Sequence, residues 1–135
     1  MIEKDATAAV RHAMPLCETL GIRADEYSGD GVVLSLDWSE SLCTSNGVLH
    51  GGAIMALADS AGGACALLNL PAEASGTATI ESKTNFLGAV RGGTVTASST
   101  PLHRGRATIV IETSVRDATG KLVAKVTQTQ MILGL

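Results

Sequence analysis

The chain has 135 residues, the usual size of one domain, and we expect a single domain spanning residues 1–135. Its formal net charge of −3 provides no overall basic field, which argues against nucleic acid as a partner. Aromatic residues make up only 2% of the chain, so its core must be aliphatic and rich in alanine.

Residues 1–20 are a predicted N-terminal helical segment. Apolar residues recur at roughly helical spacing from Asp5 to Leu20, Pro15 is expected to shorten or divide this helix, and Gly21 is well placed to end it. Residues 1–11 carry charges of both signs and no apolar stretch, unlike a secretory signal. We therefore expect a cytoplasmic protein.

Two short strands should follow, at residues 22–27 and 32–38, around a hairpin turn that contains Gly29 and Gly31. A loop is expected at 42–47, and then one long helix at 50–69, which Pro71 prevents from continuing. This helix is too short, and too clearly interrupted by an acid, to be a membrane span, so no membrane association is expected.

After the helix the pattern changes to segments rich in Thr, Val and Ile that alternate apolar with polar residues. Glycine-containing turns join them. Two strands, one helix and four further strands predict an α+β domain with an antiparallel sheet. The four strand candidates are 77–87, 94–103, 107–116 and 122–132.

The sequence shows neither a disulfide framework nor a metal site. Its cysteines are odd in number and lack C-x-x-C spacing, and its three histidines lack metal-ligand spacing, so we expect no bound metal. No recognisable cysteine-hydrolase segment accompanies the thiols, which argues against a catalytic cysteine. The cysteines are Cys17, Cys43 and Cys65.

The most informative stretch is the long helix and the glycines that open it. The apolar run 53–68 contains one charged residue, Asp59, and an ionised carboxylate is costly to bury unless it is paired or functional. Gly51 and Gly52 precede the run, where the backbone N–H groups of a helix start have no intrahelical partner. A positive helix end and a lone acid together suit acyl transfer. We interpret Gly51 as functional, and Gly62 and Gly63 as packing residues.

These motifs resemble the hotdog-fold acyl-CoA thioesterases, and within them the phenylacetate-pathway (PaaI) type, which carries Asp rather than Glu as its acid. The resemblance implies one antiparallel sheet wrapped around one long central helix. It covers nearly everything after about Gly21. The residues that carry it are His50, Gly51, Gly52 and Asp59 with the segments 60–64, 81–87, 104–106 and 117–124.

The resemblance also implies roles for individual residues. Asp59 would attack the thioester carbonyl or activate a water, while the Gly51 N–H, with His50, would stabilise the developing oxyanion. Related enzymes carry an amide side chain seven residues before the glycine. Here that position is Thr44, and either its hydroxyl or Asn46 would substitute. Thr79 matches a Ser or Thr that supports the water.

A basic turn is the candidate site for the phosphates of coenzyme A, which is part of the substrate, so that no separate cofactor is expected. Arg104, Gly105 and Arg106 form this turn, and His103 and Arg91 would join its rim. In this family the acid and the oxyanion donor of one site come from opposite subunits. The implied assembly is therefore a homodimer at minimum, with a tetramer as the family expectation.

Other interpretations remain open at this stage. Asp59 could be a structural acid, His50 a simple helix cap, Thr79 an ordinary strand residue, and the arginines solvated surface charges. A non-catalytic acyl-CoA sensor on the same fold is one alternative, although the segment before Gly21 is too short for a DNA-binding domain. A hotdog dehydratase or hydratase is another, but such enzymes use a proline-containing entry to the helix, which is missing here.

Overall fold

The computed structural model describes residues 3–135, so Met1 and Ile2 of the predicted N-terminal segment lie outside the described residues. Two short 3₁₀ turns, η1 (Glu40–Leu42) and η2 (Ser45–Gly47), precede the long helix. The helices are α1 (Lys4–Ala13), α2 (Pro15–Leu20) and α3 (Gly51–Leu67), and the strands are β1 (Arg23–Ser28), β2 (Gly31–Asp37), β3 (Gly76–Phe86), β4 (Thr94–Arg104), β5 (Thr108–Arg116) and β6 (Leu122–Leu133).

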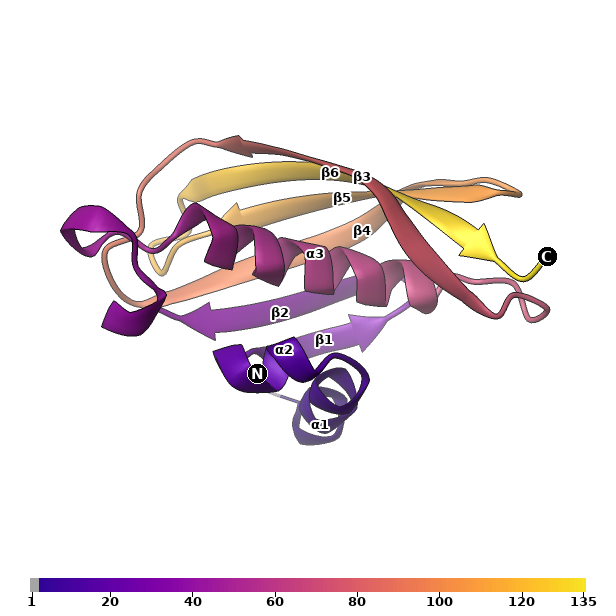
Figure 1. The fold of residues 1–135 in the computed structure, drawn as a ribbon, viewed down its shortest axis with the longest axis horizontal. Helices are drawn as coiled ribbons and strands as arrows, with labels where there is room; N and C mark the ends of the chain where they lie inside the picture. Colours follow the sequence, from indigo (N-terminus) through magenta and orange to yellow (C-terminus); the bar gives the residue numbers. More distant parts are fainter. Residues whose placement is uncertain (1–2) are drawn as a thin grey trace.

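All six strands form one antiparallel sheet in the order β1-β2-β4-β5-β6-β3. The sheet curves around α3, which packs against five of the strands (Figure 1). The predicted α+β architecture, with an antiparallel sheet around one long helix, is confirmed. The helix is slightly shorter than the predicted 50–69, because His50 lies at its N-cap and Leu68 at its C-cap.

The N-terminal segment divides where the sequence indicated. Pro15 occupies the first turn of α2, where a backbone N–H would have no partner within the helix, so that proline sacrifices no hydrogen bond there. Met14 separates the two helices. Gly21 ends α2 with φ 71°, a left-handed conformation that glycine adopts without steric penalty.

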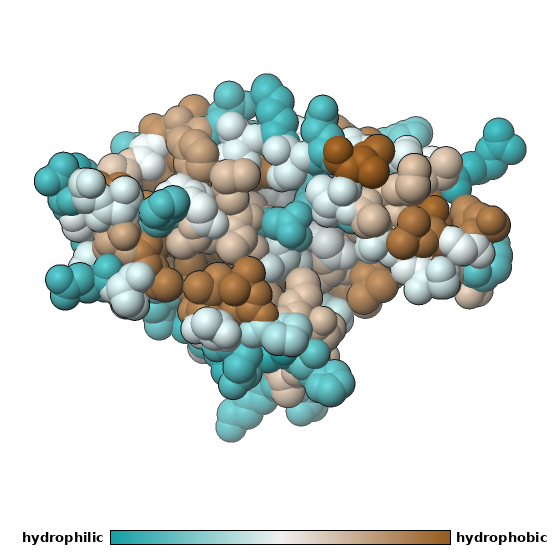
Figure 2. Space-filling view, viewed as in Figure 1, coloured by the Kyte–Doolittle hydropathy of each residue, from teal (hydrophilic) through white to brown (hydrophobic). Residues whose placement is uncertain are grey.

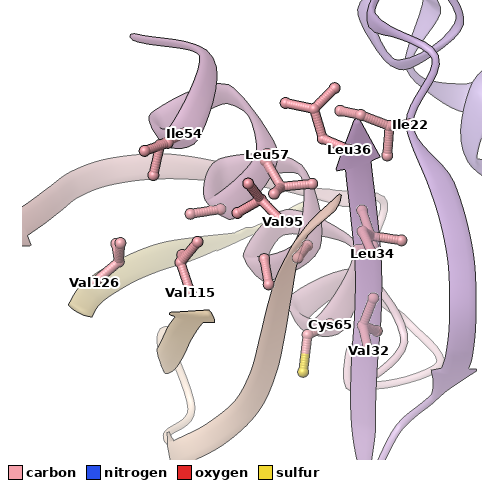
Figure 3. Close-up of a cluster of buried hydrophobic side chains, with 14 of the residues drawn as sticks. Ile22, Val32, Leu34, Leu36, Ile54, Leu57, Cys65, Val95, Val115 and Val126 are labelled. Carbon is pink, nitrogen blue, oxygen red and sulfur yellow. The ribbon is translucent and has the colours of Figure 1, made fainter. Parts of the chain in front are cut away.

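The core lies between α3 and the concave face of the sheet and is almost wholly aliphatic. Leu57 of α3 is fully buried there, as are Leu34 and Leu36 of β2, Val95 of β4 and Val115 of β5 (Figure 3). Strand residues alternate between buried and more exposed positions, as the period-two pattern predicted. Each fully buried aliphatic side chain contributes about 1.5–3 kcal/mol to the stability of the fold. Aliphatic burial can therefore hold the sheet on the helix although the chain has few aromatic residues.

The two edges of the sheet differ in how they are covered. At β1, the Glu3 N–H donates to the Ala24 carbonyl (2.8 Å), and the Ala24 N–H donates to Thr7 Oγ1 (2.9 Å). Within residues 3–135, β3 pairs only with β6, although it is 11 residues long and mostly exposed. The β3 edge is therefore open to another strand.

Within the described part of the chain, no helix combines the length and the apolar character needed to cross a membrane.

Candidate active site

The loop that leads into α3 is held by hydrogen bonds at several points. Trp38 Nε1 donates to the Gly47 carbonyl (3.0 Å), the Thr44 N–H to the Val48 carbonyl (2.8 Å), and the Leu49 N–H to the Val90 carbonyl (2.8 Å). Asn46 adopts φ 63°, a left-handed conformation that asparagine tolerates better than most residues. The side chains of Thr44 and Asn46 are exposed at this end of α3.

His50 caps the start of α3. Its Nδ1 accepts a hydrogen bond from the Gly52 N–H (2.7 Å), so in this arrangement the proton of a neutral ring resides on Nε2, which can donate. The Ala53 and Ile54 N–H groups both donate to the His50 carbonyl. Among residues 3–135 the Gly51 N–H has no hydrogen-bond partner, so it is the free donor at the positive end of the helix.

The ring of Phe86 lies over Gly51. A Cβ built on Gly51 would come within 3.2 Å of the Phe86 ring, and half of the Phe86 side chain is exposed. Glycine at this position therefore allows the aromatic ring of Phe86 to pack next to the residue that carries the free N–H.

Asp59 is not buried in the single chain, which corrects the expectation drawn from its apolar surroundings. It lies on the exposed side of α3 with Met55 and Leu67, while Leu57, Ala58 and Ala61 face the sheet. The helix is apolar on nearly all sides, so hydrophobicity does not reveal which side the sheet covers.

Two strands supply hydrogen bonds to Asp59. Gln128 Nε2 from β6 donates to Oδ1, and Thr79 Oγ1 from β3 lies 3.4 Å from the same oxygen. Gln130 Nε2 donates in turn to Thr79 Oγ1, and its Oε1 accepts from Thr77 Oγ1 (3.0 Å). The structure thus brings the predicted Thr79 to the predicted acid.

The sequence interpretation missed Gln128, Gln130 and Thr77. A signal was present, because Val126, Gln128, Gln130 and Ile132 occupy every second position of β6 and so share its inward face. Amides on the buried face of a strand need hydrogen-bond partners, and an acid on the facing helix is a suitable one.

The second glycine pair has two different roles. A Cβ on Gly62 would overlap Gln128 Oε1, so Gly62 makes room for that side chain, in agreement with a packing role. A Cβ on Gly63 would meet nothing within 4 Å in the chain. Gly63 instead borders an open cavity.

This cavity of about 360 Å³ lies beside Asp59, between the edge strands β1 and β3. Figure 2 shows that the face on which α3 is visible carries several separate apolar patches rather than a uniformly polar surface. The side chains and glycines that line the cavity include Met14, Tyr27, Asp59, Gly63, Thr79 and Gln130.

A wider surface hollow of about 860 Å³ lies along α1 and α2 and contains none of the predicted site residues. Its Arg11 donates to the Ile22 carbonyl, and its Arg23 is paired with Asp37. Of these two cavities we take the smaller one as the candidate active site, because it has a carboxylate, Asp59, on which two hydrogen-bond donors converge.

Gly51 and Asp59 do not meet within one chain. They are eight residues apart on the same helix, which corresponds to about 12 Å of rise. A carbonyl must be within about 3 Å of each group that acts on it, so one chain cannot present both groups to the same thioester.

The predicted phosphate-binding residues also divide into two places. Arg104, Gly105 and Arg106 form the β4–β5 turn, where the Gly105 N–H donates to the Thr108 carbonyl (2.8 Å). His103 adjoins this turn, whereas Arg91 precedes the opposite end of β4, roughly 30 Å away along an extended strand. The structure therefore does not bring Arg91 to the predicted rim within one chain. Both arginines of the turn are exposed, and no salt bridge to them is found within residues 3–135.

The cysteines contribute nothing to this arrangement. Cys17 and Cys65 are fully buried, and burial raises the pKa of both thiols, although a hydrogen bond with Ser60 partly offsets the rise at Cys17. Residues 3–135 contain no group of three or more His, Cys, Asp and Glu side chains arranged to hold a metal ion.

Comparison with known proteins identifies the family of the chain. Residues 46–124 match the family model of the thioesterase superfamily. A 1,4-dihydroxy-2-naphthoyl-CoA hydrolase of Listeria monocytogenes is 31% identical over 110 residues, which cover 82% of this chain and 89% of the relative.

Two solved structures show the same fold. A mutant thioesterase from Pseudomonas aeruginosa superposes with a TM-score of 0.88 at 25% identity, covering 96% of this chain and 94% of the other. A hypothetical thioesterase from Streptococcus pneumoniae, solved with coenzyme A, gives a TM-score of 0.76 at 25% identity, covering 84% and 86%. The chain therefore belongs to the thioesterase superfamily, and its sheet wrapped around α3 is the hotdog fold.

Proposed function

We propose that this protein hydrolyses an acyl-CoA thioester to a free acid and coenzyme A. The observation that carries the proposal is a carboxylate, Asp59, held by donors on one oxygen beside a cavity, in a chain whose long helix also begins with a free N–H at Gly51. Both features are what thioester hydrolysis requires, and membership of the thioesterase superfamily supports the reaction class.

Catalysis would follow one of two routes that use the same groups. In one, Asp59 accepts a proton from a water whose oxygen attacks the carbonyl carbon; in the other, the carboxylate attacks and water hydrolyses the resulting anhydride. Either way a tetrahedral oxyanion forms, and it is stabilised by the Gly51 N–H and by His50 Nε2–H. The C–S bond then breaks, and the thiolate of coenzyme A takes up the proton held by Asp59 in the first route, or a proton from solvent in the second.

The active site would be shared between two copies of the chain. Met55 lies midway between Gly51 and Asp59 in the sequence and is 41% exposed on the free side of α3. If two α3 helices run antiparallel about a twofold axis beside Met55, Gly51 of each copy approaches Asp59 of the other. Such an arrangement overcomes the separation within one chain and would cover Asp59.

The open edge of β3 supports the same assembly. Ile80, Phe86 and Leu87 are each at least half exposed along or just after this strand, and long exposed edges with apolar residues favour pairing with another chain. A dimer is the minimum that the shared site needs. We extend the proposal to a cytoplasmic tetramer built from two such dimers, as in the family that the sequence resembles.

Coenzyme A would be held partly through its phosphates. Exposed Arg104 and Arg106 present two guanidinium groups that suit phosphate oxygens, and His103 lies next to them. The Streptococcus pneumoniae relative solved with coenzyme A supports binding of this ligand by the fold.

The acyl group would occupy the cavity beside Asp59, whose 360 Å³ suits a small-to-medium or aryl group. Asp59, rather than Glu, favours a PaaI-like member, and the Listeria relative is a hydrolase of an aryl-CoA. Thr44 or Asn46, on the loop at the Gly51 end, would orient the water or the thioester.

Thiol release from a panel of aryl, short, medium and long acyl-CoAs tests the function. We expect hydrolysis of at least one class without added metal, and a rate at least about a hundredfold lower after Asp59→Asn. Binding of acyl-CoA without thiol release from any member of the panel would replace hydrolysis with a sensor function.

A further inference from the structure

We propose that Gln128 is a positioning residue that fixes the carboxylate of Asp59 in its reactive orientation, and that Gly62 is glycine in order to permit this contact. The inference rests on the proposed thioesterase function and adds a residue on β6 to the site. It is carried by three observations: a buried donor, an unpartnered buried acceptor, and a close approach that only glycine allows.

The first observation is the hydrogen bond itself. Gln128 has no exposed surface, yet its Nε2 reaches Asp59 Oδ1 at the edge of the cavity. A fully buried amide is held by its packing, so its N–H has a fixed direction and can fix the direction of the group that accepts it.

The second observation is the state of the other end of the amide. Gln128 Oε1 is buried and has no hydrogen-bond partner among residues 3–135. Leaving a buried acceptor unpaired is unfavourable. Rotating the amide by half a turn would not help, because it would set Oε1 against the Asp59 carboxylate. The amide therefore keeps the orientation that serves Asp59.

The third observation is the position of Gly62. Oε1 lies against the helix backbone where a Cβ on residue 62 would overlap it, so any larger residue at Gly62 would displace the amide. Glycine inside a helix is less favourable than alanine, and the contact with Gln128 accounts for its presence at this position.

Both donors to the acid converge on one oxygen. Gln128 and Thr79 each donate to Oδ1. Thr79 in turn accepts a hydrogen bond from Gln130, and Gln130 accepts one from Thr77. Within the described residues Oδ2 accepts no hydrogen bond. Neutral donors thus orient the carboxylate without pairing it with a cation, and they leave Oδ2 for the proton transfer or the attack.

The test replaces Gln128 by a residue of similar length that cannot donate. Gln128→Met should lower kcat by about tenfold to a hundredfold with little change in KM, because misplacing a reacting group by about 1 Å has effects of this size. In the Asp59→Asn background the same substitution should cause no further loss. A purely structural role would lower the rate in both backgrounds.

Two further variants separate positioning from stability. Thr113→Val breaks the buried Ser99–Thr113 hydrogen bond (2.7 Å) between β4 and β5, a bond that involves neither Gln128 nor Asp59, and should leave kcat at the parental value. Gly62→Ala should displace the Gln128 amide and reproduce the loss of kcat without touching Gln128 itself. Assembly of each variant is checked by light scattering.

The outcomes are distinct. Parental kcat in a correctly assembled Gln128→Met or Gly62→Ala protein would overturn the positioning role while leaving the proposed function intact. A parent chain that releases no thiol from any acyl-CoA would overturn the proposed function and this role with it.

Discussion

Gly51 and Asp59 belong to the same helix but are separated by about 12 Å of helix rise, so the free N–H at the helix start and the carboxylate cannot act on one carbonyl within one chain. Each is accompanied by its own neighbours. At Gly51, His50 caps the helix and the Phe86 ring packs against the glycine. At Asp59, Gln128 donates a hydrogen bond to the carboxylate. One chain thus carries two different halves of an active site.

The charge of Asp59 is the feature on which the mechanism depends most. Asp59→Asn keeps the side-chain volume and still accepts the hydrogen bond from Gln128, but it can neither take a proton nor attack. We expect kcat to fall by about a hundredfold to ten-thousandfold, the usual loss when a general base or nucleophile is removed. Binding of a non-hydrolysable acyl-CoA analogue, measured by calorimetry, should change little. A correctly assembled variant that kept most of its kcat would make Asp59 a structural acid.

The arginine turn should govern affinity rather than chemistry. Reversing both charges with Arg104→Glu and Arg106→Glu should raise KM about tenfold or more, since hydrogen bonds to charged groups are worth about 1.5–3 kcal/mol, with a smaller effect on kcat. Steady-state kinetics at two salt concentrations measure this. Lys4→Glu, on α1, is a control for the change in net charge. An unchanged KM in the double variant would place the phosphates elsewhere.

Thiol labelling tests the burial of two of the three cysteines. Cys43 is half-buried, whereas Cys17 and Cys65 are fully buried and burial raises the pKa of both. Because the thiolate is the reactive form, a thiol reagent should modify about one cysteine per folded chain quickly, and the other two only after unfolding. Peptide mapping identifies the site, and rapid labelling of Cys17 would contradict the burial described here.

Acid stability should depend on the pair between Arg23 and Asp37. Arg23 donates two hydrogen bonds to this carboxylate (2.9 and 3.0 Å) and Thr94 a third (2.7 Å), which together lower the pKa of Asp37. A lowered pKa in the folded state means that the stabilisation is complete above the unfolded value of about 3.9 and is lost as the pH falls through the folded value. The Asp37 side chain is 59% exposed, so solvent screens the pair and it is worth at most about 1 kcal/mol.

Asp37→Asn should therefore unfold more easily than the parent at pH 6, and the difference should shrink below about pH 4. Urea titrations across this range give the free energies of unfolding. Asp30→Asn, in the exposed β1–β2 turn, serves as the control. A difference between parent and Asp37→Asn that grew on acidification would reverse the sign argued here.

Local chemistry explains why the fold could be predicted from the sequence. Period-two alternation in the late strands, Pro15 within a helical segment and Gly21 after it are each decided by a few neighbouring residues, and the structure agrees with them. The helix start at Gly51 could be predicted for the same reason.

The site was predictable only in part, because its remaining contacts join distant segments. Gln128 meets Asp59 across 69 positions, and no local pattern reveals which acid a buried amide faces. The exposure of Asp59 was also hidden, since α3 carries apolar or small residues on both its covered and its open sides. Hydrophobicity alone does not distinguish the side of a helix that the sheet covers from the side that would contact a second copy of the chain.

A mixing experiment with two inactive variants tests the shared site most directly. Asp59→Asn removes the acid, and Gly51→Pro removes the free N–H at the first helical position, where the backbone suits proline; His50, with φ −61° and ψ 134°, already has the conformation required before a proline. The half-exposed Phe86 ring, which a Cβ at Gly51 would approach to 3.2 Å, must shift slightly to accommodate the proline. The two purified variants are unfolded together, refolded as a mixture and assayed for thiol release, with each variant refolded alone as its control. If Asp59 of one copy acts with Gly51 of the other, random reassociation should restore activity to about a quarter of the parental sites. A refolded mixture that contains hybrid dimers but shows no activity beyond the two variants alone would contradict the shared site.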